Sequence, residues 1–525
     1  MRLNKIFFIL FTTALALVGC SPDTGNYTYT ELNDIEIAMP ARLSAVLHET
    51  LDVEPRLSAR SLDERDYTFE WKVYPADNSA PTVLATSRDL HVDVTLPTGA
   101  YTLVYTITER EGGFFYRATA DLQVNTPFSA GWLVLCDDAG RARLDMYSDI
   151  KQKLYTDILP PALGSMNGPL SISYVNQYSI QESPFYLVTE DGTTRLSSND
   201  FAWKEEYRIS YEMGDEASRN VVPALVAVNG PGKVIVDNAG GVYYCNNIMG
   251  DGLYNKKRSN NFAVAPFVGY DLLTPHFIPV FLLYNQNTKN FVVCAEMFSN
   301  TDLLGVTTPV DVSLKAMYTV YGFPFGNYSL FSIPDRTYDL RWMGNTTYDP
   351  MNMGVGTTYA VMSSASKTMV YGLALGDMMG LRDEKYGNTV TLVMQADLTA
   401  CTDIAKARGF AFSSLKNMMY YAVDNKIYRV NLSQTNPTAE LDIVLPDGEY
   451  VSCLKFYHFT QGVNASRSHN LIVGSVNNDD VGILRIYDGW AQEGVFKGQE
   501  PMQKLSGFAP IKDVIYREII SEWDI

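Results

Sequence analysis

Repeated pairs of apolar runs, joined by short polar turns, fill the chain from residue 131 onward and constrain its fold more than any other feature. Each pair has Gly, Asn or Asp at its turn. These residues accept the left-handed backbone of tight turns, so the pattern predicts a series of β-hairpins. Seven such units lie at residues 131–148, 184–198, 232–246, 279–296, 358–377, 417–432 and 470–489.

Hairpins that repeat every roughly 40 to 60 residues are typical of the blades of a β-propeller. A stack of β-sandwiches is the alternative, but it predicts further proline-rich linkers like the one near Pro127, and the sequence has none. We therefore expect an all-β chain with a β-propeller-like domain of about seven blades over residues 127–525. A closed ring requires that its ends meet, so residues 513–519 should pair with strands near 131–147.

Residues 35–126, before these hairpins, predict a separate β-domain. Short runs of alternating Val, Tyr, Phe and Thr fill the segment, and a Gly pair separates the last two runs. This alternation predicts an antiparallel sandwich, and a length of about 90 residues suits an immunoglobulin-like domain. Because Trp71 alternates with Phe69 and Val73, we expect it to be buried between the sheets.

The first 20 residues carry the parts of a secretory signal. Arg2 and Lys5 form a positive start, an apolar run of about a dozen residues follows, and small residues precede Cys20. A transmembrane helix is the alternative, but the run is shorter than the roughly 20 residues that a bilayer core needs. The ending at Cys20 resembles a bacterial lipobox, which implies removal of residues 1–19 and acyl chains on Cys20. Residues 21–34 are polar and rich in turn-forming residues, so we expect residues 20–34 to form a tether.

Charge and cysteine content limit the classes of partner. The chain has 41 basic and 59 acidic residues, and loss of the signal with Arg2 and Lys5 leaves a net charge of about −20. Such a field repels phosphate backbones, and no block of Lys and Arg stands out, so nucleic acid is not an expected partner. Of the five cysteines besides Cys20, four lie in apolar runs. We expect these thiols to pack as small hydrophobic groups and not to form disulfides.

Several segments together resemble the PKD-like family lipoproteins of Bacteroidetes. They are GNYTYTELNDIEI at 25–37, the hairpin at 100–124, SAGWLVLCDDAGRARLDMYS at 129–148 and the late repeat at 407–432. The resemblance implies a lipoprotein of the outer membrane, exposed at the cell surface. It also implies two partners, a TonB-dependent SusC-like channel and a SusD-like lipoprotein, which import oligopeptides or oligosaccharides. The family resemblance does not imply a particular reaction.

No complete catalytic or metal-binding motif is found in the sequence. His48 and Glu49 begin like the zinc motif H-E-x-x-H, but Asp52 stands where the second histidine belongs. The five histidines are scattered, and neither a G-x-S-x-G elbow nor a P-loop occurs. The sequence therefore predicts no catalytic residue, no metal site and no cofactor.

A glycosidase needs only two carboxylates about 5 to 10 Å apart and leaves no sequence motif, so this alternative stays open. Loop acids such as Asp339, Asp349 and Asp377 are of the kind that it would use.

Aromatic side chains outside the hairpins are the candidate ligand-binding residues. Rigid aromatic faces on propeller loops suit a sugar ring, a peptide side chain or a protein partner, although they equally suit local blade packing. The candidates form two clusters, Trp203, Tyr207 and Tyr211, and Tyr338, Trp342 and Tyr348.

These observations predict an accessory binding or assembly lipoprotein of a nutrient importer. The alternatives are a surface glycosidase or lyase that trims the same nutrient, and a purely structural component of the importer complex.

Overall fold

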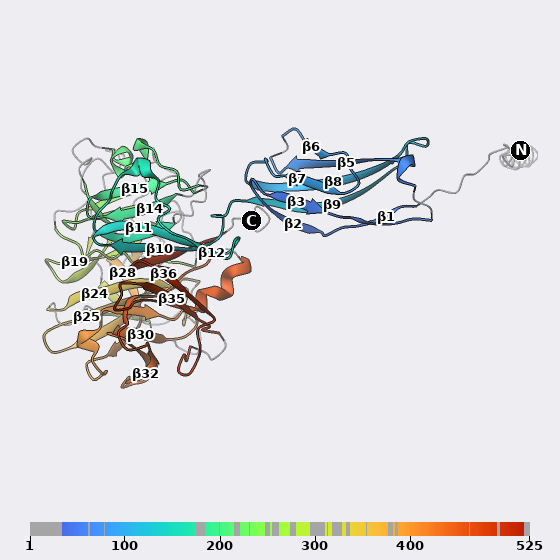
Figure 1. Ribbon diagram of the computed structural model, residues 1–525. Coiled ribbons are helices and arrows are strands. Elements are labelled where there is room, and N and C mark those ends of the chain that lie inside the picture. Colours follow the sequence, from blue (N-terminus) through green and yellow to red (C-terminus); the bar gives the residue numbers. More distant parts are fainter. Residues whose placement is uncertain are drawn as a thin grey trace, which may run out of the picture. The chain divides into compact units, whose positions relative to one another are not determined.

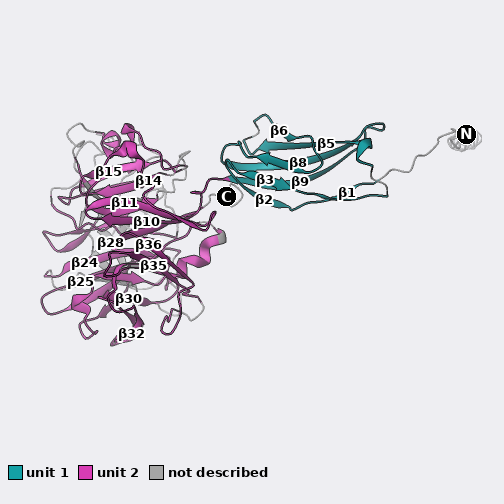
Figure 2. Ribbon diagram, viewed as in Figure 1, with its two compact units in different colours: residues 1–124 teal, residues 125–525 magenta. Residues whose placement is uncertain are grey.

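A computed structural model describes residues 34–518 of the chain. The described range excludes the segments 61–62, 78, 175–183, 199, 215–220, 230–231, 247–252, 255–261, 274–279, 295–309, 312, 318–327, 332–336, 353, 376–381, 384–386, 461 and 491–493. The signal peptide and Cys20 therefore lie outside it. The chain divides into two compact units, residues 1–124 and 125–525 (Figure 2).

The first unit is an antiparallel β-sandwich. Its five-stranded sheet has the order β2 (Arg42–Val46), β9 (Phe115–Asn125), β8 (Gly99–Glu109), β5 (Tyr67–Pro75) and β6 (Thr82–Ala85). Two short pairs complete the unit, β1 (Glu36–Ala38) with β4 (Arg56–Ser58) and β3 (Thr50–Val53) with β7 (Leu90–Asp93). The 3₁₀ turn η1 (Glu64–Asp66) precedes β5.

Trp71 lies at the centre of the sandwich core with no exposed surface, so the predicted burial is confirmed. Its indole stacks on Tyr105, with ring centroids 4.1 Å apart, and its Nε1 donates a 3.0 Å hydrogen bond to the Ser87 carbonyl. Trp71 therefore buries a large apolar face and still satisfies its one polar atom.

The second unit consists of consecutive β-sheets that follow the chain around a ring (Figure 1). The first sheet joins β10 (Gly131–Asp138), β11 (Arg141–Ser148) and β12 (Lys153–Tyr155) to the C-terminal β37 (Ile511–Arg517). The second contains β13 (Pro169–Tyr174), β14 (Phe185–Thr189) and β15 (Gly192–Leu196), and the third contains β16 (Pro223–Asn229), β17 (Gly232–Asp237) and β18 (Val242–Asn246). The fourth contains β19 (Phe281–Asn285), β20 (Asn290–Cys294) and β21 (Val310–Asp311).

Three further sheets complete the ring. The fifth contains β22 (Ser313–Met317), β23 (Tyr328–Phe331), β24 (Asp339–Thr346), β25 (Thr357–Ser363), β26 (Thr368–Ala374), β27 (Arg382–Asp383) and β28 (Gly387–Asp397). The sixth contains β29 (Gly409–Phe412), β30 (Met418–Val423), β31 (Lys426–Asn431) and β32 (Ala439–Val444). The seventh contains β33 (Tyr450–Phe456), β34 (Leu471–Val476), β35 (Gly482–Tyr487) and β36 (Gln503–Phe508). Short 3₁₀ segments connect strands, η2 (Pro161–Leu163), η3 (Glu205–Tyr207), η4 (Ile209–Glu212), η6 (Ile404–Lys406) and η7 (Gly462–His469).

The two ends of the second unit meet in one sheet. β37 pairs antiparallel with β10 from Gly131↔Arg517 to Cys136↔Ile511, and Figure 1 shows the red C-terminal strand beside β10. The predicted closure is therefore confirmed, and the ring has the all-β, propeller-like architecture expected from the hairpin spacing. The fifth sheet departs from the hairpin pattern, because β22 pairs parallel with β28.

Buried ion pairs recur in four of the blades. In each, an arginine on the third strand of the blade contacts a carboxylate whose side chain is less than a tenth exposed. Pairing with an opposite charge offsets part of the cost of removing these groups from water. The pairs are Arg143–Asp145, Arg195–Glu212, Arg429–Asp442 and Arg485–Glu449.

The cysteines Cys136, Cys245, Cys401 and Cys453 are buried free thiols. Burial raises the pKa of Cys401 to about 11 and that of Cys453 to about 12. These two thiols are therefore protonated and unreactive at neutral pH. No helix in the described part of the chain is long and apolar enough to cross a membrane.

Candidate binding site in the propeller channel

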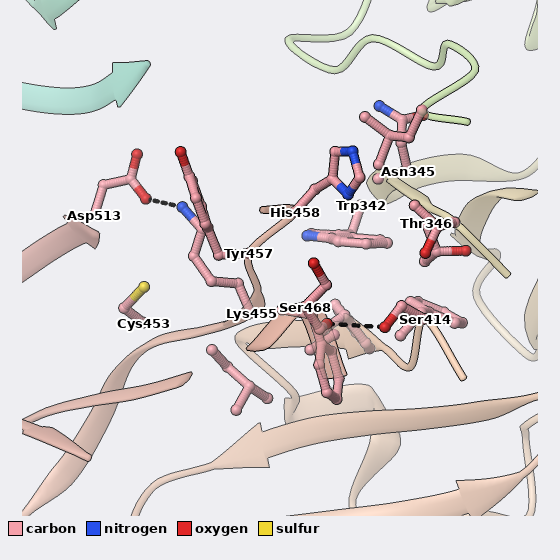
Figure 3. Close-up of a pocket in the computed structure, with 18 residues that line it drawn as sticks. Trp342, Asn345, Thr346, Ser414, Cys453, Lys455, Tyr457, His458, Ser468 and Asp513 are labelled. Atoms are coloured by element: carbon pink, nitrogen blue, oxygen red, sulfur yellow. Dashed lines mark hydrogen bonds and ion pairs between the residues drawn. The ribbon is translucent and has the colours of Figure 1, made fainter. Parts of the chain in front are cut away.

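Two adjoining cavities lie where the inner strands of the blades face one another. One, of about 320 Å³, is lined mainly by β24, β29 and β33, and Figure 3 shows its side chains. The other, of about 370 Å³, is lined mainly by β13, β16, the segment 266–270 and β24. Gly344, Asn345 and Asp513 line both cavities. Together the cavities form the channel, which is the candidate functional site.

Asp513 connects three inner strands at the wall of the channel. Its carboxylate is 2.5 Å from Lys455 Nζ of β33 and accepts a 3.1 Å hydrogen bond from the Ile172 backbone N–H of β13. Burial alone would lower the pKa of Lys455, but the charge and hydrogen bond of Asp513, together with smaller contributions from Cys453 and Tyr270, outweigh it, so the pKa is raised. Lys455 therefore stays charged at neutral pH, and the pair carries no net charge into the channel.

An aromatic stack forms another part of the wall. Trp342 of β24 stacks on Phe412 with ring centroids 5.2 Å apart, and Phe412 stacks on Tyr359 at 4.2 Å. Gly344 is required for this arrangement, because a Cβ at that position would lie 2.3 Å from the Trp342 ring. Trp342 is only partly buried and lines the cavity of about 320 Å³.

Polar groups with unused hydrogen-bonding capacity also line the channel. His458 Nδ1 and Ser173 Oγ are buried and have no hydrogen-bond partner among the described residues. Burial lowers the pKa of His458, so its imidazole is neutral at neutral pH, and burial raises the pKa of Tyr457, so its hydroxyl stays protonated. The channel therefore offers neutral donors and acceptors beside a balanced ion pair.

The first predicted aromatic cluster lies on the connection between β15 and β16. Trp203 Nε1 donates a 2.7 Å hydrogen bond to Thr194 Oγ1, and the Arg208 guanidinium lies over its ring. Tyr207 is partly buried and has the Lys204 ammonium over its ring, whereas Tyr211 is 55% exposed. None of the three aromatic residues lines either channel cavity.

The structure divides the second predicted cluster. Tyr338 is buried in an apolar core, where its carbonyl accepts a 2.5 Å hydrogen bond from the Tyr284 hydroxyl. Tyr348 packs against the core around Tyr359, and its carbonyl accepts a bond from Thr357 Oγ1. Trp342 alone of the six predicted aromatic residues lines a channel cavity.

Of the loop acids, neither Asp339 nor Asp349 lines a channel cavity. Asp339 forms an ion pair with Lys289, and Asp349 accepts a 2.8 Å hydrogen bond from the Gly354 N–H. Asp377 lies outside the described residues. Asp513 is the one carboxylate among the described residues that line the two channel cavities.

Ser414, which lines the cavity of about 320 Å³, contacts a histidine. Ser414 Oγ lies 2.8 Å from His469 Nδ1 and donates a 2.8 Å hydrogen bond to the Ser468 carbonyl. Burial lowers the pKa of His469, which leaves it neutral and able to accept a proton. No carboxylate orients His469 within the described ranges. No group of three or more His, Cys, Asp or Glu side chains suited to a metal ion occurs there either.

Sequence reasoning missed Asp513, Lys455, His458 and the Ser414–His469 contact. These residues stand in ordinary strand or loop contexts, and Lys455 and Asp513 are 58 positions apart. The only signal for these residues was the alternation of apolar and polar side chains along β33 and β37. This alternation separates the two faces of a strand but does not show which face lines the channel.

Comparison with known proteins agrees with the expected family resemblance over part of the chain. Residues 20–168 match the PKD-like family, a range that covers the described sandwich and continues into the first propeller sheet. The late repeat at 407–432 lies outside the matched range. No curated protein matches the sequence.

Several solved structures are similar over most of the chain. A quinonprotein alcohol dehydrogenase-like protein from Bacteroides thetaiotaomicron is 12% identical, covers 91% of this chain and 97% of its own, and has a TM-score of 0.41. The extracellular domain of a putative one component system from the same organism is 9% identical, with coverages of 94% and 84% and a TM-score of 0.25. A rhamnogalacturonan lyase is 12% identical, with coverages of 86% and 68% and a TM-score of 0.21. At these identities and scores the similarities carry no argument about activity, and the sequence match to the PKD-like family stays limited to residues 20–168.

Proposed function

We propose that this chain is a surface-exposed, lipid-anchored protein of the outer membrane whose propeller channel binds a neutral polar ligand, a short glycan or peptide. In this proposal it serves as an accessory binding or assembly component beside a SusC-like TonB-dependent channel and a SusD-like lipoprotein. The observation that carries the binding role is the cavity of about 320 Å³, which is lined by Trp342, His458 and the Lys455–Asp513 pair. The lipobox-like ending at Cys20 and the PKD-like match support the cellular setting.

The chemistry of the channel favours an uncharged ligand. Asp513 balances the charge of Lys455, and the pKa directions of Tyr457 and His458 keep both side chains neutral. An aromatic face such as Trp342 stacks on a sugar ring or an apolar side chain, and the neutral polar groups then fix orientation. A charged ligand would leave the ion pair unbalanced in a confined space.

Titration calorimetry of the mature protein against neutral glycan and peptide pools tests the binding role. Trp342→Ala should weaken binding about tenfold, because an aromatic contact in a pocket contributes more than a polar contact at a rim. Trp203→Ala is the matched control, because Trp203 lies outside both cavities, and it should bind like the native protein. Equal losses in the two variants, or no binding at all, would contradict a channel site.

Purification from native membranes tests the assembly role separately. We expect mass spectrometry of the purified complex to identify a SusC-like TonB-dependent channel and a SusD-like lipoprotein. If neither is found under conditions that retain other outer-membrane complexes, the importer association is wrong. That result would not affect the proposed ligand site in the propeller, which the titration tests independently.

A surface enzyme that trims the same nutrient is the second candidate, and the Ser414–His469 contact is the observation that favours it. Against a glycosidase, the described cavity lining contains one carboxylate where two are needed. An activity screen with Ser414→Ala and Asp513→Asn decides between the candidates. Turnover that either substitution abolishes would establish the enzyme, whereas binding without new chain ends supports the binding protein.

A further inference from the structure

The turn between β8 and β9 presents two adjacent aromatic side chains to solvent. Phe114 is 51% exposed and Phe115 is 59% exposed. The turn is well formed, because the Glu109 N–H donates to the Phe114 carbonyl at 2.8 Å and the Gly113 N–H donates to the Glu109 carbonyl at 3.1 Å. Gly113 has φ +68°, a backbone conformation that residues other than glycine rarely adopt. The tip is therefore held in a defined shape.

The tip lies at the end of the sandwich where the described chain begins. Figure 1 shows the start of β1 and the β8–β9 turn at the same end of this unit. The charges of Asp34 and Glu109, after burial, raise the pKa of Tyr116, which agrees with Asp34 lying near the start of β9. Residues 21–33 separate Asp34 from Cys20, and a chain of this length reaches at most roughly 50 Å. An acyl anchor on Cys20 would therefore keep this end of the sandwich near the lipid.

The arrangement of the two rings favours a lipid surface over a protein groove. Phe115 is the first residue of β9, and the bond from the Glu109 N–H to the Phe114 carbonyl continues the pairing by one residue. Because side chains alternate along extended backbone, we expect Phe114 and Phe115 to project from opposite sides of the tip. A protein partner that docks on one face leaves one ring in water, whereas a bilayer interface surrounds both. The Arg117 guanidinium lies over the Phe115 ring, with 4.6 Å to the centroid, and Arg110 is exposed on the same turn. Arginine beside aromatic rings is typical of a membrane–water interface, where the cation reaches lipid phosphates.

We propose that the β8–β9 turn, with Phe114 and Phe115 at its tip, is a lipid-contacting surface that rests in the membrane interface. This inference rests on the lipid anchor of the proposed function. The turn then acts as a second, weak contact that fixes the orientation of the sandwich above the membrane.

Quenching by brominated lipid tests this contact. The mature chain is coupled through Cys20 to a maleimide lipid in phosphatidylcholine vesicles, so the result does not depend on lipidation in the cell. In Phe114→Trp, the fluorescence added by the new indole should fall about twofold or more when brominated phosphatidylcholine replaces the ordinary lipid, because indoles settle at the interface. Tyr74→Trp is the matched control. Tyr74 is 41% exposed near the opposite end of the same sheet, and its indole should not be quenched.

Equal quenching at the two positions, or none at either, would overturn the proposal. Phe115→Trp provides a second probe on the other face of the tip and should be quenched like Phe114→Trp. Quenching at Phe114 but not at Phe115 would also overturn it, because it indicates a one-sided contact such as a protein groove. The proposed function fails by a different result, the absence of acyl chains on Cys20 in mass spectra of the native protein.

Discussion

The sandwich and the propeller differ most at their centres. In the sandwich, Trp71 and Tyr105 stack at the middle of the domain with no exposed surface. In the propeller, the innermost strands carry Lys455 and Asp513, whose side chains remain 29% and 17% exposed. Two sheets that pack face to face close their centre with side chains, whereas the inner strands of a ring only surround theirs. The ring thus leaves room for polar chemistry at a place where the sandwich has none.

The largest expected effect tests the closed centre of the sandwich. Trp71→Ala should lower the free energy of unfolding of this unit by about 3–5 kcal/mol, because it leaves a cavity and an unmatched Ser87 carbonyl. Calorimetry, or the rate of limited proteolysis within the sandwich, measures the loss of stability. Tyr74→Ala on the same strand is the control, since Tyr74 is 41% exposed and should change stability little. Similar melting of the Trp71 variant and the native protein would show that this core is not closed.

A smaller effect tests the polar centre of the propeller. Asp513→Ala should destabilise the ring by about 2–3 kcal/mol, because Lys455 loses its counter-charge and the Ile172 N–H loses its acceptor. The shift of the propeller's transition in a thermal unfolding experiment measures this loss of stability. The exposed Asp121 of the sandwich provides a charge-matched control, and Asp121→Ala should leave that transition in place. An unchanged unfolding transition in Asp513→Ala would mean that Asp513 does not stabilise the sheet that closes the ring.

The smallest effect concerns pH. Burial lowers the pKa of His458 below its ordinary value of 6.5, so the unfolded chain binds this proton first as the pH falls. Below neutral pH this proton binding lowers the free energy of the unfolded state relative to the folded state, so the propeller should lose stability between about pH 7 and pH 5. His458→Gln should reduce this loss in denaturant titrations at the two pH values. His91→Gln, at an exposed position of the sandwich, should leave the pH dependence of the ring unaltered, and an equal reduction in both variants would contradict the assignment.

The local elements of the fold were predictable. The alternation around Trp71 predicted its burial, and the hairpin units predicted the β25–β26, β30–β31 and β34–β35 pairs. The parallel pairing of β22 with β28 was not predictable, because parallel neighbours are joined by long connections without a turn signal. Within the candidate site, aromatic content pointed to Trp342, but Tyr338 has the same kind of context and is buried in a core.

The sequence by itself determined where strands begin and turn, that the chain is all-β and that its C-terminal run returns to pair with residue 131 and its neighbours. These features depend on residues that are close in the chain or on the need to cover a free edge. Only the tertiary structure decided which side chains share the channel. The Ile172 N–H and the Asp513 carboxylate are 341 positions apart and meet at 3.1 Å. Such contacts arise because a ring brings one strand from every sheet to a common centre, and no local pattern records which strand faces which.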